Sequence, residues 1–420
     1  MSVIKSLSAL EILDSRGRPT VQVNCSLASA TATASVPSGA STGKAEALEL
    51  RDGDVTRYGG LGCQKAVDNV ATIINGALTG KPFETQAELD RFLLELDGTD
   101  NKSSLGANAI LGVSLAFARA QAREKKLPLY EHFSNLVGER PQYLPRLTIN
   151  LFSGGKHAGG QVVIQDVLLV PVSATTIADS LAMTYAVVQS ATEIVKTKYE
   201  SRPLKADEGG LAPAFASEEA MIEDAVKAIE NAGLIPGKDV SLAIDVASSH
   251  FYGNNVYELG NAHLSGDEMV SRLETWLDDY PIISLEDGLA EEDWTHWAKL
   301  NAKLGEKSLI LGDDFLCTNP ERIKRATDSK AANALLLKVN QIGTLTEAAE
   351  ALKLARKNNW QVVVSARSGE TEDNWLADLA TGWQGDFIKV GSIQQSERLA
   401  KYNRLLAIEA ETGLELKPLQ

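Results

Sequence analysis

The feature that most constrains the fold of this chain is a series of short apolar runs that alternate with amphipathic helical patterns. Nearly continuous apolar runs of this length are typical of parallel strands that are buried on both faces. A long succession of strand then helix favours a closed (β/α)8-type barrel, in the α/β class, over an open sheet. The runs occupy residues 240–244, 282–285, 309–311, 334–337, 362–364 and 387–388.

Charged or polar residues follow these runs, where the strands are expected to end. Any single residue of this kind is best explained as a solvated loop residue or a helix cap. Chance is a poor explanation for six successive strands, because the carboxyl ends of parallel barrel strands meet at one rim, where active sites are built. The residues at this rim are Asp245, Glu286, Asp313, Lys338, Ser365, Arg367, Ser368 and Lys389.

Three carboxylates in this set, from Asp245, Glu286 and Asp313, would repel one another unless a cation lay between them. Carboxylate oxygens without a neighbouring Cys or His indicate a hard ion, so Mg²⁺ is expected before Zn²⁺. The two lysines, Lys338 and Lys389, then divide the work. One is expected to abstract a proton, with a pKa lowered by burial and by the metal, and the other to stay cationic and hold a substrate carboxylate.

The amino-terminal part of the chain has a different pattern. Residues 20–25 alternate in the way that is typical of an antiparallel strand. Helical patterns follow at residues 64–78, 84–96 and 106–126. We therefore predict an α+β domain over residues 1–138 and a catalytic barrel over residues 139–420.

The charge and composition of the chain exclude several classes of partner. Its net charge of −15, from 41 basic and 56 acidic residues, argues against nucleic acid and anionic lipid. No apolar run reaches the roughly 18 to 20 residues that span a bilayer, and no signal peptide is visible. Three widely spaced cysteines fit a reducing cytosol. We expect a cytoplasmic protein that attracts a small anionic substrate through local lysines, arginines or metal ions.

Seven motifs along nearly the whole chain resemble those of the enolase family. They are residues 13–17 (LDSRG), 36–43 (VPSGASTG), 105–112 (LGANAILG), 207–210 (DEGG), 284–287 (SLED), 336–343 (LLKVNQIG) and 396–403 (SERLAKYN). The second motif resembles the loop that closes on substrate. The resemblance implies a barrel of the enolase kind with a capping domain, dehydration of 2-phospho-D-glycerate to phosphoenolpyruvate in glycolysis, and a homodimer or larger homo-oligomer.

The resemblance also implies a role for each residue of the site. Lys338 would remove the C2 proton, and Glu208 would protonate the departing C3 hydroxyl. Lys389 and two Mg²⁺ ions, the second arriving with substrate, would stabilise the doubly charged intermediate. The implied set comprises catalytic Lys338, Glu208, Lys389 and Asp166, substrate-binding His157, Gln165, Arg367, Ser368 and Ser41, and metal-binding Asp245, Glu286, Asp313 and Ser41.

Five positions depart from the family pattern. Where enolases have Gln-Glu, this chain has Gln165 and Asp166, whose shorter side chain withdraws the carboxyl group by roughly an ångström, a displacement that can cost about 10²-fold. The usual histidine before the phosphate-binding arginine is Ala366, which lacks an acid–base contribution of typically about 10²–10⁴-fold. The others are Ala206 for a glycine, Gly160 for an asparagine and Gln395 for an arginine.

These departures cluster on the leaving-group and phosphate side, whereas the metal carboxylates and both lysines are intact. The parent enolase reaction, at a reduced rate, is the first hypothesis. The second is a paralogue acting on a related phosphate or phosphonate, such as a carboxyphosphonoenolpyruvate synthase-like enzyme, which Asp166 and Ala366 favour. A non-catalytic binding protein ranks last, because a cluster of unused carboxylates is costly to keep folded.

Overall fold

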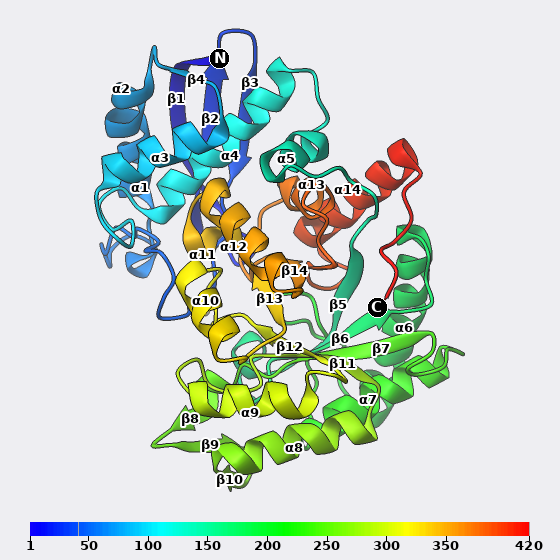
Figure 1. Cartoon of the computed structure of the whole chain (residues 1–420). Coiled ribbons are helices and arrows are strands. Elements are labelled where there is room, and N and C mark those ends of the chain that lie inside the picture. The colour runs from blue at the N-terminus through cyan, green and yellow to red at the C-terminus, as the bar shows by residue number, and fades with distance from the viewer. Residues whose placement is uncertain (41, 420) are drawn as a thin grey trace.

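The amino-terminal part of the protein begins with an antiparallel sheet. The computed structural model describes residues 1–40 and 42–419, so Ser41, a predicted metal and substrate ligand, lies outside the described residues. The four strands lie in the order β3-β2-β1-β4, at the blue end of the ribbon in Figure 1. They are β1 (Ser2–Leu13), β2 (Pro19–Leu27), β3 (Thr31–Ser35) and β4 (Pro82–Phe83).

Helices cover this sheet, and α4 packs against β2 and β3. The segment predicted as a helix over residues 64–78 is helical throughout, but its middle, Val70–Ile74, is a π turn between α1 and α2. The helix predicted over residues 84–96 begins instead at Gln86, because Thr85 is its N-cap and forms a capping box with Glu88. The helices are α1 (Gln64–Asn69), α2 (Asn75–Leu78), α3 (Gln86–Asp97), α4 (Ala107–Glu124) and α5 (Leu129–Val137).

Eight strands close into a barrel in the order β11-β12-β13-β14-β15-β5-β6-β7, which confirms the predicted fold class. Its interior is filled by apolar side chains such as Leu168, Leu311 and Phe387, so the barrel is a packed core. The strands are β5 (Arg146–Ser153), β6 (Asp166–Pro171), β7 (Val240–Asp245), β11 (Ile282–Glu286), β12 (Leu309–Gly312), β13 (Ala334–Leu337), β14 (Gln361–Ser365) and β15 (Phe387–Lys389).

The six strands predicted from apolar runs are parallel to one another, but another barrel strand runs against them. Strand β6 is antiparallel to both β5 and β7. A loop without a crossover α-helix joins β5 to β6, and such a connection reverses the direction of the chain. Asp166 therefore stands at the start of its strand, yet it pairs with Asp245 at the end of β7 and lies at the same rim.

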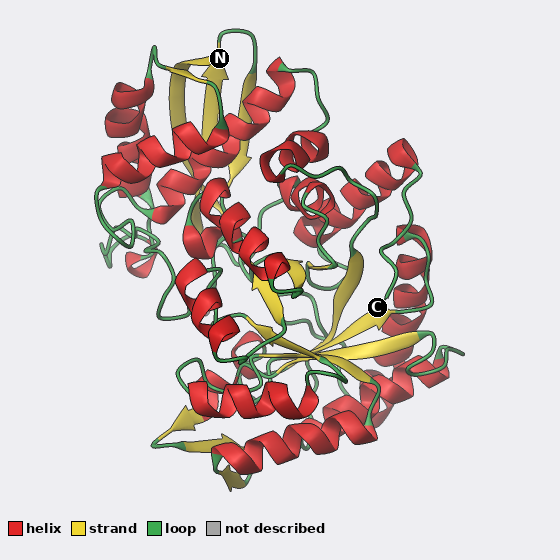
Figure 2. Cartoon of the chain, viewed as in Figure 1, coloured by secondary structure: helices red, strands yellow, loops and turns green. Residues whose placement is uncertain are grey.

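Helices surround the barrel (Figure 2). A small sheet of three strands is formed by the segment that connects β7 to α8. The outer helices are α6 (Ile177–Lys198), α7 (Glu218–Asn231), α8 (Gly266–Asp279), α9 (Trp294–Leu304), α10 (Pro320–Asp328), α11 (Val339–Ile342), α12 (Leu345–Lys357), α13 (Trp375–Gly382) and α14 (Ser396–Thr412). The small sheet comprises β8 (Tyr252–Gly253), β9 (Val256–Leu259) and β10 (Ala262–Leu264). Within the described residues, no helix combines the length and the apolar character needed to cross a membrane.

Polar contacts fasten the amino-terminal sheet and helices to the barrel. The Lys102 ammonium lies 2.9 Å from a carboxylate oxygen of Glu347 in the first turn of α12. The backbone N–H of Ala47 donates to the carbonyl of Gln341 at 2.8 Å, which brings the chain that follows the 36–43 loop to the barrel rim.

Candidate active site

Asp245 and Glu286 lie side by side at the ends of β7 and β11, and Lys389 from β15 bonds to both. The Lys389 Nζ is 2.8 Å from Oδ2 of Asp245 and 2.8 Å from Oε2 of Glu286. Burial would raise the pKa of Asp245, but Lys389 outweighs it and lowers the pKa to about 2. Burial and the charge of Asp245 raise the pKa of Glu286 well above its usual range. The two carboxyl groups thus share one lysine, and the charge of Asp245 favours the protonated form of Glu286.

Lys338 forms an ion pair with Asp313 at the ends of the next two strands. Gln341 donates to the other oxygen of Asp313 at 2.8 Å, and Thr318 joins Gln341 to the Lys338 backbone N–H. Burial would lower the pKa of Lys338, but Asp313 outweighs it, so the pKa lies above its ordinary value. The direct contact with the Asp313 carboxylate therefore outweighs the lowering by burial, and the lowering expected from a bound metal ion stays a prediction.

The donor set fits a hard cation. The candidate ligands Asp245, Glu286 and Asp313 are all carboxylates, and Asp245 and Asp313 both raise the pKa of Glu286. Gln165 adds a neutral oxygen: its Nε2 donates to Asp245 at 3.0 Å, while its buried Oε1 has no hydrogen-bond partner among the described residues. Such an oxygen-only set suits Mg²⁺.

The three predicted ligands together are nevertheless not one of the groups of metal-capable atoms that lie within 4.8 Å of one another in the described residues, and each of them accepts a hydrogen bond from a lysine. In the part of the chain that the structure describes, two other groups of metal-capable atoms lie within 4.8 Å of one another, namely His157, Asp166 and Glu208, and Asp287, Asp313 and Asp314. Asp287 has a clear structural purpose, since it accepts from the backbone N–H groups of Asp313 and Asp314 at 2.9 and 2.8 Å.

His157 lies between two buried carboxylates, and one of them, Asp166, begins β6, which is next to Asp245 on β7 but four strands from β13 and Lys338. Its Nδ1 is 2.9 Å from Oδ2 of Asp166, and its Nε2 is 3.9 Å from Oε1 of Glu208. Burial alone would lower the pKa of His157, but Asp166 and Glu208 raise it to about 9, so the ring is an imidazolium at neutral pH. Burial raises the pKa of Asp166, whereas His157 and Arg398 overcome burial and lower that of Glu208.

Arg367 and Ser368 follow β14, and both side chains are engaged. Two nitrogens of Arg367 lie 3.1 and 3.2 Å from the carboxylate oxygens of Glu46, and a third contact at 3.0 Å reaches Asn340. The Ser368 hydroxyl accepts from Arg16 at 3.2 Å. Ala366 is buried beside them, and its backbone N–H donates to the Lys389 carbonyl at 2.8 Å.

The structure thus brings the described predicted residues to one rim, in two groups. One group comprises Lys338, Lys389 and the three acids. The second, the His157 group, comprises His157, Asp166 and Glu208. The two groups interact electrostatically, because Glu208 and Asp166 raise the pKa of Lys389.

Several contacting residues were missed by sequence reasoning. Gln341 could have been found, because it follows Lys338 by about one helical turn within a recognised motif. Asn150, which donates to Glu208 at 3.1 Å, lies on a strand that no apolar run had indicated. Arg398 lies in the recognised 396–403 motif, but its contacts with the carbonyls of Arg367 and Ser368 could not be read from the sequence. Glu46 gave no local signal, because it contacts Arg367 from a distant part of the chain.

Two family descriptions match this chain: "Enolase, N-terminal domain" over residues 4–133 and "Enolase, C-terminal TIM barrel domain" over residues 141–417. Among curated relatives, "Enolase 1" of Methylococcus capsulatus is 48% identical over 414 residues, covering 98% of this chain and 97% of the relative. "Enolase" of Desulfotalea psychrophila is 46% identical over 417 residues, covering 98% of each chain.

Proposed function

The chain belongs to the enolase family, and on that premise we propose that it catalyses the Mg²⁺-dependent dehydration of 2-phospho-D-glycerate to phosphoenolpyruvate. The observation that carries the proposal is the pairing of Lys338 and Lys389 with three carboxylates at the rim, with the His157 group across the barrel from Lys338. Such a site can remove a proton on one side of a substrate and supply one on the other.

Asp245, Glu286 and Asp313 would hold Mg²⁺, which when bound supplies positive charge against the charge that develops on the substrate carboxylate. Lys338 takes the C2 proton at Nζ, and for this it must be neutral. The ion pair between Lys338 and Asp313 must therefore open in the working enzyme. Lys389 stays charged beside Asp245 and Glu286 and stabilises the dianionic intermediate.

Glu208 donates a proton to the C3 hydroxyl as it leaves. Its low pKa in this arrangement means that it needs a proton first, and the His157 imidazolium, 3.9 Å away, can supply it. Asp166 holds His157 in this orientation. Arg367 and Ser368 bind the phosphate, with the arginine exchanging Glu46 for the more highly charged ligand.

The proposed test is conversion of 2-phosphoglycerate by the purified protein, followed by the ultraviolet absorbance of the enol product. Lys338→Ala should abolish activity, whereas Lys324→Ala, an exposed lysine on α10, should not. Turnover in the typical enzyme range of roughly 1–10³ s⁻¹ would mean that Asp166 and Ala366 are tolerated. Loss of all turnover with Mg²⁺ still bound would reject the parent reaction and favour the phosphonate alternative, which neither relative's name supports.

We expect the protein to work in the cytoplasm as a homodimer or larger homo-oligomer, with its domains divided at residues 138 and 139. Light scattering in solution tests the assembly. Limited proteolysis around residue 138 tests the division.

A further inference from the structure

A turn of the amino-terminal domain docks directly onto the segment that follows β14. The backbone N–H of Ser15 donates to the Glu370 carbonyl at 2.7 Å, and the Ser15 hydroxyl donates to the Ser368 carbonyl at 3.2 Å. Gly369 pairs with Ser38 through two backbone hydrogen bonds of 2.8 and 2.9 Å. Two segments of the amino-terminal domain, the 14–18 turn and the start of the 39–43 loop, thus meet at the proposed phosphate-binding residues.

The guanidinium of Arg16 lies at the centre of this junction. It donates to the Asp14 carboxylate at 3.0 Å and to the Ser38 carbonyl at 3.1 Å. Its other terminal nitrogen donates to the Ser368 hydroxyl at 3.2 Å. The Arg16 side chain is 5% exposed and that of Asp14 is not exposed, so this pair is shielded from solvent, where charged hydrogen bonds are strong.

Close packing at Gly369 fixes the position of Arg16. A methyl group on Gly369 would overlap both the Asp14 carboxylate and the Arg16 guanidinium. The Asp14–Arg16 pair therefore lies directly on the backbone between Ser368 and Glu370. The planar guanidinium can then reach the hydroxyl on one side and the loop carbonyl on the other.

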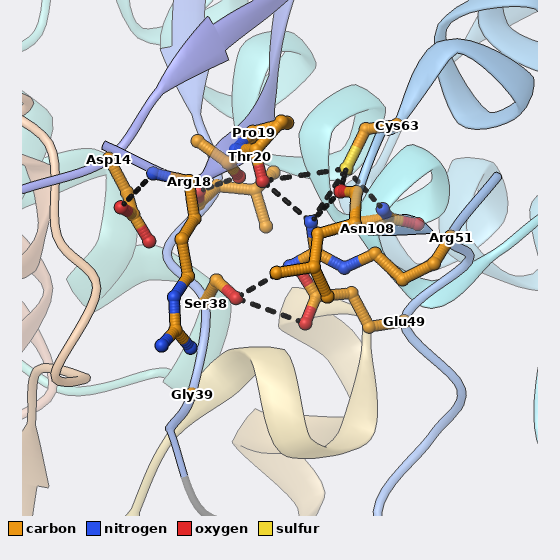
Figure 3. Close-up of polar contacts among 12 residues, drawn as sticks. Asp14, Arg18, Pro19, Thr20, Ser38, Gly39, Glu49, Arg51, Cys63 and Asn108 are labelled. Atoms are coloured by element: carbon orange, nitrogen blue, oxygen red, sulfur yellow. Dashed lines mark hydrogen bonds and ion pairs between the residues drawn. The ribbon is translucent and has the colours of Figure 1, made fainter. Parts of the chain in front are cut away.

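Ser38 is held from its other side as well. Its hydroxyl donates to Glu49 at 3.1 Å and accepts from Arg51 at 2.8 Å. Figure 3 shows Ser38 between these two side chains. Arg51 is itself fixed by the Pro19 carbonyl at 2.6 Å and by Sγ of Cys63 at 3.1 Å. Ser38 is thus a fixed point from which the loop beginning at Gly39 departs.

We infer that Arg16 is a positioning residue for phosphate recognition, because it orients the Ser368 hydroxyl and holds the backbone at Ser38 and Gly39 with one side chain. The inference rests on the proposed function, in which Ser368 binds the phosphate. Arg16 does not contact the substrate. It sets the hydrogen-bond geometry of a residue that does, and it joins that residue to the loop.

The test is a double-mutant cycle with Arg16→Gln and Ser368→Ala, measured as kcat and KM for 2-phosphoglycerate. We expect Arg16→Gln to raise KM roughly 10-fold or more with a much smaller change in kcat, as the loss of a charged hydrogen bond predicts. The effect of Arg16→Gln on KM should be clearly smaller in the Ser368→Ala background than in the wild type, because part of it is transmitted through Ser368 and only the contact with Ser38 remains. Arg18→Gln, an exposed arginine of the same turn, should behave as wild type.

Multiplicative effects in the double variant, or a fall in kcat at constant KM, would overturn the inference. Arg16→Lys keeps the charge beside Asp14 and serves if Arg16→Gln does not fold. It should lie between wild type and Arg16→Gln in KM, since one ammonium cannot reach all three partners. If the wild type does not turn over 2-phosphoglycerate, the proposed function has failed. The role of Arg16 is then tested by the affinity for inorganic phosphate, measured as protection against thermal unfolding. A lower affinity in Arg16→Gln than in the wild type supports the role, and an unchanged affinity rejects it.

Discussion

The imidazole Nδ1 of His157 lies 2.9 Å from Oδ2 of Asp166, and both side chains are buried. The other oxygen of Asp166 accepts from the Ser153 hydroxyl. The short carboxylate is therefore already committed to two partners inside the protein. It influences the leaving-group side of the reaction through His157, whose raised pKa depends on its charge.

Asp166→Asn should lower kcat about 10–100-fold, because it removes a charged hydrogen bond from the imidazolium that supplies the proton. The change in KM should be smaller. Ser153→Ala is the matched control: it removes one hydrogen bond from Asp166 but leaves the charge, so kcat should fall less. Steady-state kinetics with 2-phosphoglycerate measures both. An Asp166→Asn enzyme with wild-type kcat would show that His157 needs no carboxylate partner.

The sequence predicts the charged rim well but not the contacts across it. Asp245 and Glu286 could be predicted because each ends an apolar run, and a parallel barrel places such ends together. Asp166 escaped the same argument, because it begins a strand that runs the other way. The pKa of Lys338 could not be predicted either, since its direction is set by the direct contact with Asp313.

Gln341→Leu should lower kcat by roughly 10-fold or more, because the amide holds one oxygen of Asp313 while Lys338 contacts the other. The buried Thr318 hydroxyl would also lose its acceptor. Asn340→Leu, at the neighbouring position, is the comparison. The native Asn340 side chain contacts Arg367, so its loss should act mainly on KM. Equal kcat and KM profiles for the two variants would contradict the separate roles assigned to them.

Lys389→Met should destabilise the protein strongly when Mg²⁺ is removed with a chelator. It leaves Asp245 and Glu286 as buried neighbours without their cation, and breaking such a buried pair typically costs about 3–5 kcal/mol. Added Mg²⁺ should raise the melting temperature of the variant more than that of the wild type, because the ion replaces the lost charge. Thermal unfolding in chelator and in Mg²⁺ measures this, with Lys324→Met as the control. Equal Mg²⁺ responses would argue against ion binding by these carboxylates.

Gly43→Ala should raise KM for substrate, because a methyl group there would overlap Sγ of Cys317 and press on the Asp314 backbone. The backbone N–H of Gly43 also donates to Glu46 at 3.1 Å, so displacement of this residue disturbs the partner of Arg367. Overpacking of this kind typically costs about 1–3 kcal/mol, which would correspond to roughly 5- to 150-fold in KM if the whole cost fell on binding.

Two variants sharpen the Gly43→Ala experiment. Adding Cys317→Ala removes the overlapping sulfur and should recover part of the lost affinity, though not all, because the Asp314 backbone remains close. Gly253→Ala in β8 is the control, since no atom lies within 4 Å of its added methyl group. A double variant no better than Gly43→Ala would place the clash elsewhere.

His132 in α5 should make the protein less stable in acid. Its side chain is 2% exposed, and neither ring nitrogen has a hydrogen-bond partner among the described residues. Burial, followed by the charge of Lys125, lowers its pKa from 6.5 to about 4. At pH values between about 4 and 6.5, His132 is protonated in the unfolded chain but neutral in the folded protein. The contribution of His132 to the free energy of unfolding therefore falls as the pH drops below 6.5. It no longer changes below about pH 4, where the folded protein is protonated as well.

His132→Phe removes the titrating group and should abolish this component, on the order of 3 kcal/mol. The measurement is urea unfolding of both proteins at pH 8 and pH 4.5, because the difference between them cancels the carboxylates that titrate in both. His263→Gln on β10, where the histidine is exposed, should follow the wild type. Parallel losses of stability in wild type and His132→Phe would mean that His132 is protonated in the folded protein.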